Sequence, residues 1–162
     1  MLRSHVRPAA GTVDYASLKA DRGPLDAYVA DLAGVELAHL GRDEQLALLI
    51  NAYNAFTLTL IIDAYPDLTS IRDLPEPWAG VRWTLGGHTI SLDELEHGLL
   101  RPIYRDPRVH FAINCASVGC PPLRDADFTA ALLEGQLHAA TADTLSRPAY
   151  AHVAGDRLAL TS

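Results

Sequence analysis

The 162-residue sequence predicts a single α+β domain, with a long central helix packed on a small sheet with a hairpin, and a cysteine loop at a strand end. Three observations support this fold class. The stretch from Arg42 to Tyr65 is apolar nearly all round at helical spacing, which is typical of a buried central helix. Gly86-Gly87 separates two strand-like segments and predicts a hairpin. The apolar run from Val109 to Ile113 predicts a short buried strand ahead of the two cysteines.

The other expected elements follow from local signals at their ends. Ser91 and Glu94 form a capping box that opens a helix, which Arg101-Pro102 should end. Asp127 is the expected N-cap of a last long helix. In chain order, the further elements are a helical turn at Tyr15–Lys19, a helix at Pro24–Leu32, a helix at Phe128–Leu145 and a hairpin at His152–Leu160.

The expected domain organisation is simple. Residues 1–13 form a flexible arm and residues 14–162 form the α+β domain. The chain stops directly after an apolar run that ends at Leu160, so we expect either that the natural domain continues or that another chain completes this edge.

Composition narrows the classes of function. The net charge of −7 argues against nucleic-acid partners and anionic membrane surfaces. The apolar window from Leu46 to Tyr65 is interrupted by Asn51, Asn54 and Asp63, which favours a core helix over a membrane span. The first eight residues have no apolar signal region, so we expect a cytoplasmic protein, or a periplasmic one if the N-terminus is incomplete.

Two asparagines on the long helix are informative. Asn51 and Asn54 lie three residues apart and project from one side of it. One interpretation is that their amides bond loop backbone and fix its path. The other is that at least one points into a site and orients a catalytic or ligand group.

The cysteine segment carries the candidate chemistry. Cys115 at the predicted strand end suits a nucleophile, and the turn after it could aim backbone N–H groups at a developing negative charge. His97, on a separate helix, is the preferred base, with Glu96 or Asn54 as its orienting group. His110 would lie about 16 Å from Cys115 along an extended strand, too far for direct contact. Tyr53, Asn114, Ser117, Cys120, His110 and the two helix asparagines are the candidate binding residues.

Two other interpretations stay open. Cys115 and Cys120 could cycle between thiols and a disulfide, or hold a glutathione-like thiol ligand, with Cys120 resolving a mixed disulfide. Alternatively the cysteines, the asparagines and Glu96 form a buried polar network in a non-catalytic interaction domain. No metal or cofactor is expected, because metal-ligand spacings are absent from the sequence.

Four segments together resemble a known family: Asn51-Ala-Tyr-Asn-Ala55, Ser91-Leu-Asp-Glu-Leu-Glu-His-Gly-Leu-Leu-Arg101, Asp106-Pro-Arg-Val-His-Phe111 and Cys115-Ala-Ser-Val-Gly-Cys-Pro-Pro-Leu123. Their order is similar to that of the domain of unknown function 547 family, over roughly residues 15–160. The resemblance implies an α+β domain of bacterial and some plant proteins, without an assigned activity. From Cys115 and His97, and not from the resemblance, we expect a thiol-dependent enzyme, a cysteine hydrolase or acyl transferase acting on a small molecule or peptide. The oligomeric state stays open.

Overall fold

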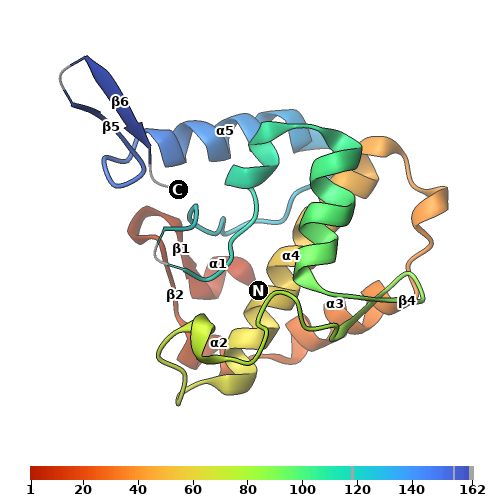
Figure 1. Ribbon diagram of the computed structural model, residues 1–162. Helices are drawn as coiled ribbons and strands as arrows, with labels where there is room; N and C mark the ends of the chain where they lie inside the picture. Colours follow the sequence, from red (N-terminus) through yellow and green to blue (C-terminus); the bar gives the residue numbers. More distant parts are fainter. Residues whose placement is uncertain (118, 155, 161–162) are drawn as a thin grey trace.

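A computed structural model describes residues 1–117, 119–154 and 156–160 (Figure 1). Helices dominate. In this part of the chain the strands pair into separate two-stranded antiparallel sheets. The α-helices are α1 (Leu2–His5), α2 (Tyr15–Ala20), α3 (Gly23–Ala33), α4 (Arg42–Ala64) and α5 (Leu133–Leu145). The hairpins are β1 (Val6–Arg7) with β2 (Thr12–Val13), β3 (Trp83–Leu85) with β4 (His88–Ile90), and β5 (Ala151–Ala154) with β6 (Arg157–Leu160).

The remaining helical segments are tighter or wider than an α-helix. Glu94–Tyr104 forms a π-helix, η4. The described residues also contain five 3₁₀ segments: η1 (Pro8–Ala10), η2 (Leu37–His39), η3 (Ile71–Asp73), η5 (Pro107–Phe111) and η6 (Ala130–Leu132).

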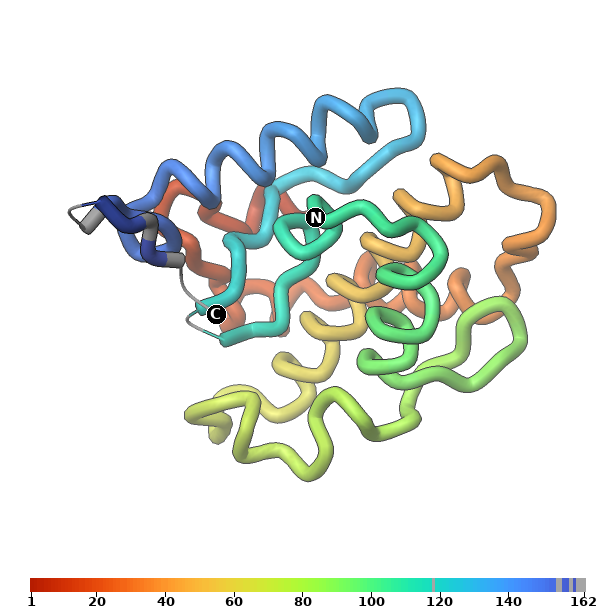
Figure 2. The backbone as a smooth tube through the Cα atoms, turned by 45° about the horizontal axis from the view of Figure 1, so that its top comes forward, coloured from red at the N-terminus to blue at the C-terminus, as the bar shows by residue number. Residues whose placement is uncertain are grey.

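Helix α4 is the centre of the fold, as the sequence predicts. It packs against α2, α3 and η4, and both views show η4 (green) alongside it (Figures 1 and 2). Fifteen of its 23 residues are buried, which explains why it is apolar nearly all round. Its length and composition would also allow it to cross a membrane, but 83% of that apolar window is buried inside the protein, as in a core helix.

Two apolar clusters lie on different sides of α4. The larger one includes Tyr53, Phe56 and residues of η4, η5 and α5. The smaller one joins Leu58 and Ile62 to α2 and α3, and it includes Val6. Burial of Val6 explains why residues 1–13, expected to be a flexible arm, instead form α1 and the β1–β2 hairpin.

The strand predicted at Val109–Ile113 is wrong. Residues 107–111 form the 3₁₀ helix η5, in which Asp106 caps the N–H of Arg108 and Pro107 occupies the first position. Val109 and Ile113 are both buried. Residues four apart share one face of a helical turn, so a helical turn buries this pair as readily as a strand does. The α+β class is correct, but α4 packs on helices and not on a sheet containing this segment.

The helix that opens at Ser91 begins as predicted and ends later. Ser91 N–H donates to Glu94, and Glu94 N–H donates to Ser91 Oγ. The helix does not stop at Arg101-Pro102, because the π-helix continues through Pro102 to Tyr104, where Arg105 takes φ +53°. A π-helix aligns residues five apart, so Glu96 and Arg101 lie over one another.

The remaining predicted elements differ from the structure mainly in where they begin and end. The helices at 15–19 and 24–32 and both hairpins are confirmed. The last helix starts at Leu133 and not at Phe128, because Asp127 does not cap it. The Gln136 side chain instead bonds the Thr129 N–H and the Asp127 carbonyl, which holds the preceding turn. The β5–β6 hairpin projects from the body (Figure 2).

Candidate functional site

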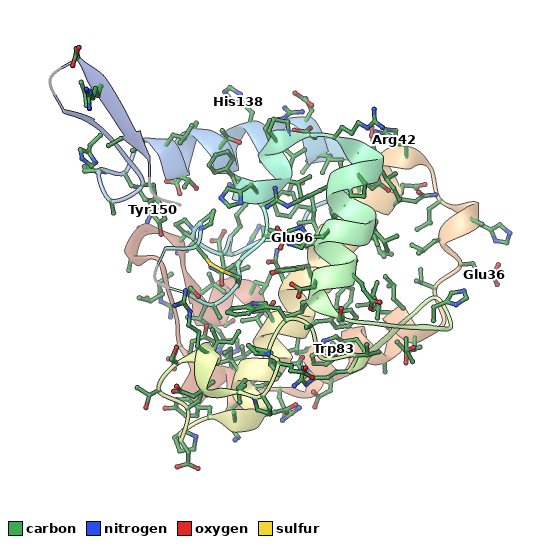
Figure 3. All side chains as sticks on the ribbon, in the orientation of Figure 1. Glu36, Arg42, Trp83, Glu96, His138 and Tyr150 are labelled. Atoms are coloured by element: carbon green, nitrogen blue, oxygen red, sulfur yellow. A yellow bond between two sulfur atoms is a disulfide. The ribbon has the colours of Figure 1, made fainter. Side chains whose placement is uncertain are left out.

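A pocket of about 570 Å³ contains most of the predicted site residues. Glu96, His97 and His110 line it together with both cysteines. Figure 3 shows the disulfide between the labelled Glu96 and Tyr150. The other predicted residues that line this pocket are Tyr53 and Ser117. Asn51 and Asn54 do not line it, because they face a second cavity.

Cys115 and Cys120 are joined in a disulfide, with their Cα atoms 6.0 Å apart. Both residues are half-buried and line the pocket, so the bridge faces solvent-accessible space. The Cys115 thiol predicted as a nucleophile is therefore bonded in this state. Two loop N–H groups are also already used, since Ala116 N–H donates to Asn114 Oδ1 and Cys120 N–H donates to the Ser117 carbonyl.

Asn54 holds the entrance to the disulfide loop. Its amide nitrogen donates to the Ala112 carbonyl, and its oxygen accepts from Asn114 N–H, each at 2.9 Å. Asn114 then donates to the Pro121 carbonyl at 2.7 Å, beyond the loop. The two asparagines thus connect α4 to both ends of the disulfide loop.

Asn51 makes the same kind of contact elsewhere. It donates to the Phe128 carbonyl at 2.8 Å and accepts from Phe128 N–H at 2.9 Å. For both asparagines the first interpretation from the sequence is correct, because each fixes the path of loop backbone. Neither touches the predicted base.

A second tether reaches the loop from the C-terminal side. The Tyr150 hydroxyl donates to the Cys120 carbonyl at 2.7 Å. Thr144 and Leu145, at the end of α5, line the pocket beside it. Tyr150 was not among the predicted site residues, because no local pattern marks a tyrosine whose partner lies 30 residues away.

Glu96 is a largely buried carboxylate of the pocket, with 14% of its side chain exposed. Arg101 Nε and Nη2 both donate to Glu96 Oε1, at 2.8 and 2.6 Å. Burial, followed by the neighbouring Glu96 charge, raises the pKa of Tyr53, so its hydroxyl stays protonated. Arg101 is a further residue that the sequence analysis missed, since its role depends on the five-residue alignment of the π-helix.

His110 is exposed, and a contact with Arg101 orients its ring. Arg101 Nη2 lies 3.3 Å from its Nδ1, and because a guanidinium can only donate, Nδ1 must accept and Nε2 carries the proton. Partial burial, followed by the Arg101 charge, lowers the pKa of His110, while the Glu96 charge partly opposes this effect. The lowered pKa favours the neutral ring at pH 7. Residues 107–111 form a 3₁₀ helix and not the predicted extended strand, and His110 lines the same pocket as Cys115.

His97 also lines the pocket, but no hydrogen bond to a described residue holds its side chain. It is exposed, and among the described residues it forms no hydrogen bond, including with Asp93 one turn earlier. The pocket therefore presents two different histidines: His110, whose Nδ1 contacts Arg101, and His97, which has no hydrogen-bond partner among the described residues.

Trp78 and Trp83 have different roles. Trp83 is partly buried and stacks on the core residue Phe56, with ring centroids 4.8 Å apart. Trp78 lines the pocket, and its buried Nε1 has no hydrogen-bond partner in the described chain. Across residues 1–117, 119–154 and 156–160, no three His, Cys, Asp or Glu side chains gather closely enough to bind a metal ion.

Comparison with known proteins identifies one family. A family model described as "Protein of unknown function, DUF547" matches residues 37–144, which include α4, the pocket residues up to Thr144 and both cysteines. No curated protein matches the chain, and no solved structure matches it.

Proposed function

Since the chain belongs to the DUF547 family, whose description names no activity, we propose its function from the site alone: thiol–disulfide exchange at the Cys115–Cys120 pair. The observation that carries the proposal is that this disulfide lines a 570 Å³ pocket with Glu96 and two histidines. The proposed substrate is a small-molecule or peptide thiol. A purely structural bridge would need no such neighbours.

The reaction consists of two exchanges. A substrate thiolate attacks one cysteine sulfur, an S–S bond to substrate forms, the Cys115–Cys120 bond breaks, and the other cysteine leaves as a thiolate. A second substrate thiolate attacks the substrate sulfur of the mixed disulfide and releases the first cysteine. Two electrons pass from two substrate thiols, which become a disulfide, to the protein, which becomes a dithiol.

The two histidines divide the handling of protons. His97 accepts the proton of the incoming thiol, because its ring is free of other hydrogen bonds among the described residues. His110 directs an Nε2–H group that can stabilise the leaving thiolate, because Arg101 occupies its Nδ1. Glu96 orients Arg101 and through it His110.

Equilibration of the folded protein in glutathione buffers of graded potential tests the proposal. Free thiols are trapped by alkylation and counted by mass spectrometry. We expect one reversible two-electron transition of the folded protein. In the reduced state, His110→Ala should raise the pH at which the more reactive cysteine is alkylated, whereas His138→Ala, an exposed histidine on α5, should not. A bridge that stays oxidised in every buffer until the protein unfolds would contradict the proposal.

A second candidate function rests on the reduced state. Glu96 and His97 line the same pocket as Cys115, as a cysteine hydrolase or acyl transferase would require. An electrophilic acyl probe should then label Cys115 only after reduction, with a rate that falls in His97→Ala. Labelling that is independent of His97 would exclude this candidate.

A further inference from the structure

A second cavity, of about 450 Å³, lies on the side of α4 away from the disulfide pocket residues. Its walls come from α1, α3, α4 and residues 123–128, and the two cavities have no lining residue in common. Its volume is within the range typical of small-molecule sites, about 300–1,000 Å³. Nothing in the proposed exchange reaction uses it.

The walls of this cavity are mostly apolar. Leu25, Leu58 and Leu123 are each at most 8% exposed, and Ala55 and Phe128 are buried beside them. These side chains provide a surface for the hydrocarbon part of a ligand, because burying such surface contributes roughly 25 cal/mol per Å².

Arg124 lines the cavity without a protein partner. In the described chain it forms no hydrogen bond and no ion pair. Its Nε is buried, so a ligand in the cavity would reach the outer guanidinium nitrogens, which share the positive charge. An anionic oxygen there would form a charge-assisted hydrogen bond.

A second donor lies in the same cavity. Burial, followed by the charge of Asp127, raises the pKa of Tyr28 to about 12, so its hydroxyl is protonated at neutral pH. That hydroxyl forms no hydrogen bond among the residues described here. Asp125, Asp127 and Arg3 also line the cavity, with Asp127 and Arg3 exposed. The two carboxylates offset the charges of the two arginines, so a ligand with one negative charge meets less repulsion than a ligand with several.

We propose that this cavity binds a monocarboxylate with an apolar body, such as a medium-chain acyl acid, with its carboxylate on Arg124 and Tyr28 and its chain against the leucines. The chemistry of the wall selects this class. Arg124 favours an anionic group over a neutral one, and Asp125 and Asp127 oppose further negative charges on the ligand.

Octanoate and octan-1-ol form the matched ligand pair for the test, measured by NMR titration of the full chain. We expect octanoate to shift signals of Tyr28, Leu58 and Arg124, and octanol to bind more weakly. Arg124→Met should weaken octanoate binding about tenfold or more, as expected for a lost charge-assisted contact, and leave octanol binding unchanged. Arg72→Met, which alters the disulfide pocket, is the control.

Two further readouts separate binding from folding. Without ligand, Arg124→Met should keep or raise the melting temperature, because it removes an unpartnered buried donor. Tyr28→Phe should weaken octanoate binding about threefold or more through loss of one neutral donor. Equal binding of octanol and octanoate, unchanged octanoate affinity in Arg124→Met, or octanoate shifts confined to the disulfide pocket would each overturn the proposal.

Discussion

Asn54 and Asn51 project from the same helix and make the same pair of bonds to loop backbone, yet they support different regions. Asn51 pairs with both backbone groups of Phe128, a core residue, and the connection ends there. Asn54 pairs with Ala112 and Asn114, and Asn114 extends the connection across the disulfide loop. Asn51 thus anchors a core residue, and Asn54 holds the loop of the candidate site.

A side-chain amide can pair with backbone N–H and C=O groups where no neighbouring strand is present. Buried backbone N–H and C=O groups need partners, and in a sheet the neighbouring strand supplies them. Residues 112–114 and 128 run through the interior without a neighbouring strand in the described structure. The two asparagines supply that donor and acceptor pair from a helix.

The largest effect is expected from Asn54→Ala. It leaves the Ala112 carbonyl and the Asn114 N–H unpaired, which should lower the free energy of unfolding by about 2–4 kcal/mol. Urea denaturation measures this change. The disulfide should also be reduced faster under native conditions, since the loop loses its anchor. Wild-type stability together with a wild-type reduction rate would show that Asn54 does not hold the loop.

The double variant Cys115→Ser/Cys120→Ser asks whether the bridge or the asparagines set the loop path. Closing so short a loop should stabilise the protein by about 2 kcal/mol, and the variant should lose that amount. Because Asn54 still holds Asn114, hydrogen-exchange protection of the Asn114 amide should persist. Loss of that protection would assign the loop path to the disulfide.

Asn51→Ala is the matched comparison for Asn54→Ala. Asn51 is less buried, so we expect a loss of about 1–2 kcal/mol in urea denaturation. The rate of disulfide reduction should stay at the wild-type value, because Asn51 bonds only Phe128. An equal acceleration in both variants would indicate a general loosening and remove the distinction between the two asparagines.

Asp106→Asn should have the smallest effect and a different pH dependence. Hydrogen bonds from Arg108 lower the pKa of Asp106, and Arg108 also pairs with Glu134 on α5. A lowered folded-state pKa stabilises the protein above the unfolded pKa of about 4, and this stabilisation is lost as the pH falls through the folded value. We expect a cost of about 1 kcal/mol at pH 7 that disappears in acid.

The asparagine variants provide the control for that pH series. Amides do not titrate, so the costs of Asn51→Ala and Asn54→Ala relative to wild type should be nearly the same at pH 7 and in mild acid. A cost of Asp106→Asn that does not change with pH would show that the ion pair does not contribute through its charge.

The features that sequence analysis predicted depend on local signals. The all-round apolar pattern of α4, the Ser91–Glu94 capping pair and the Gly86-Gly87 turn each act within one element. The 109–113 strand was wrong because a short apolar run fits a buried helical turn equally well, and only a distant partner decides between them. Tyr150 was missed because its partner lies 30 residues away. Arg101 was missed because its contact with Glu96 depends on a π-helix, which the sequence pattern did not predict.

The central claim is that the Cys115–Cys120 bridge is an accessible redox pair in a folded pocket. The most direct test is the rate of its reduction by glutathione as a function of urea concentration below the unfolding transition. We expect a measurable rate without urea and almost no dependence of the rate on urea, because the bridge is reached in the folded protein. A rate that vanishes without urea and rises with the full slope of global unfolding would contradict it and make the bridge purely structural.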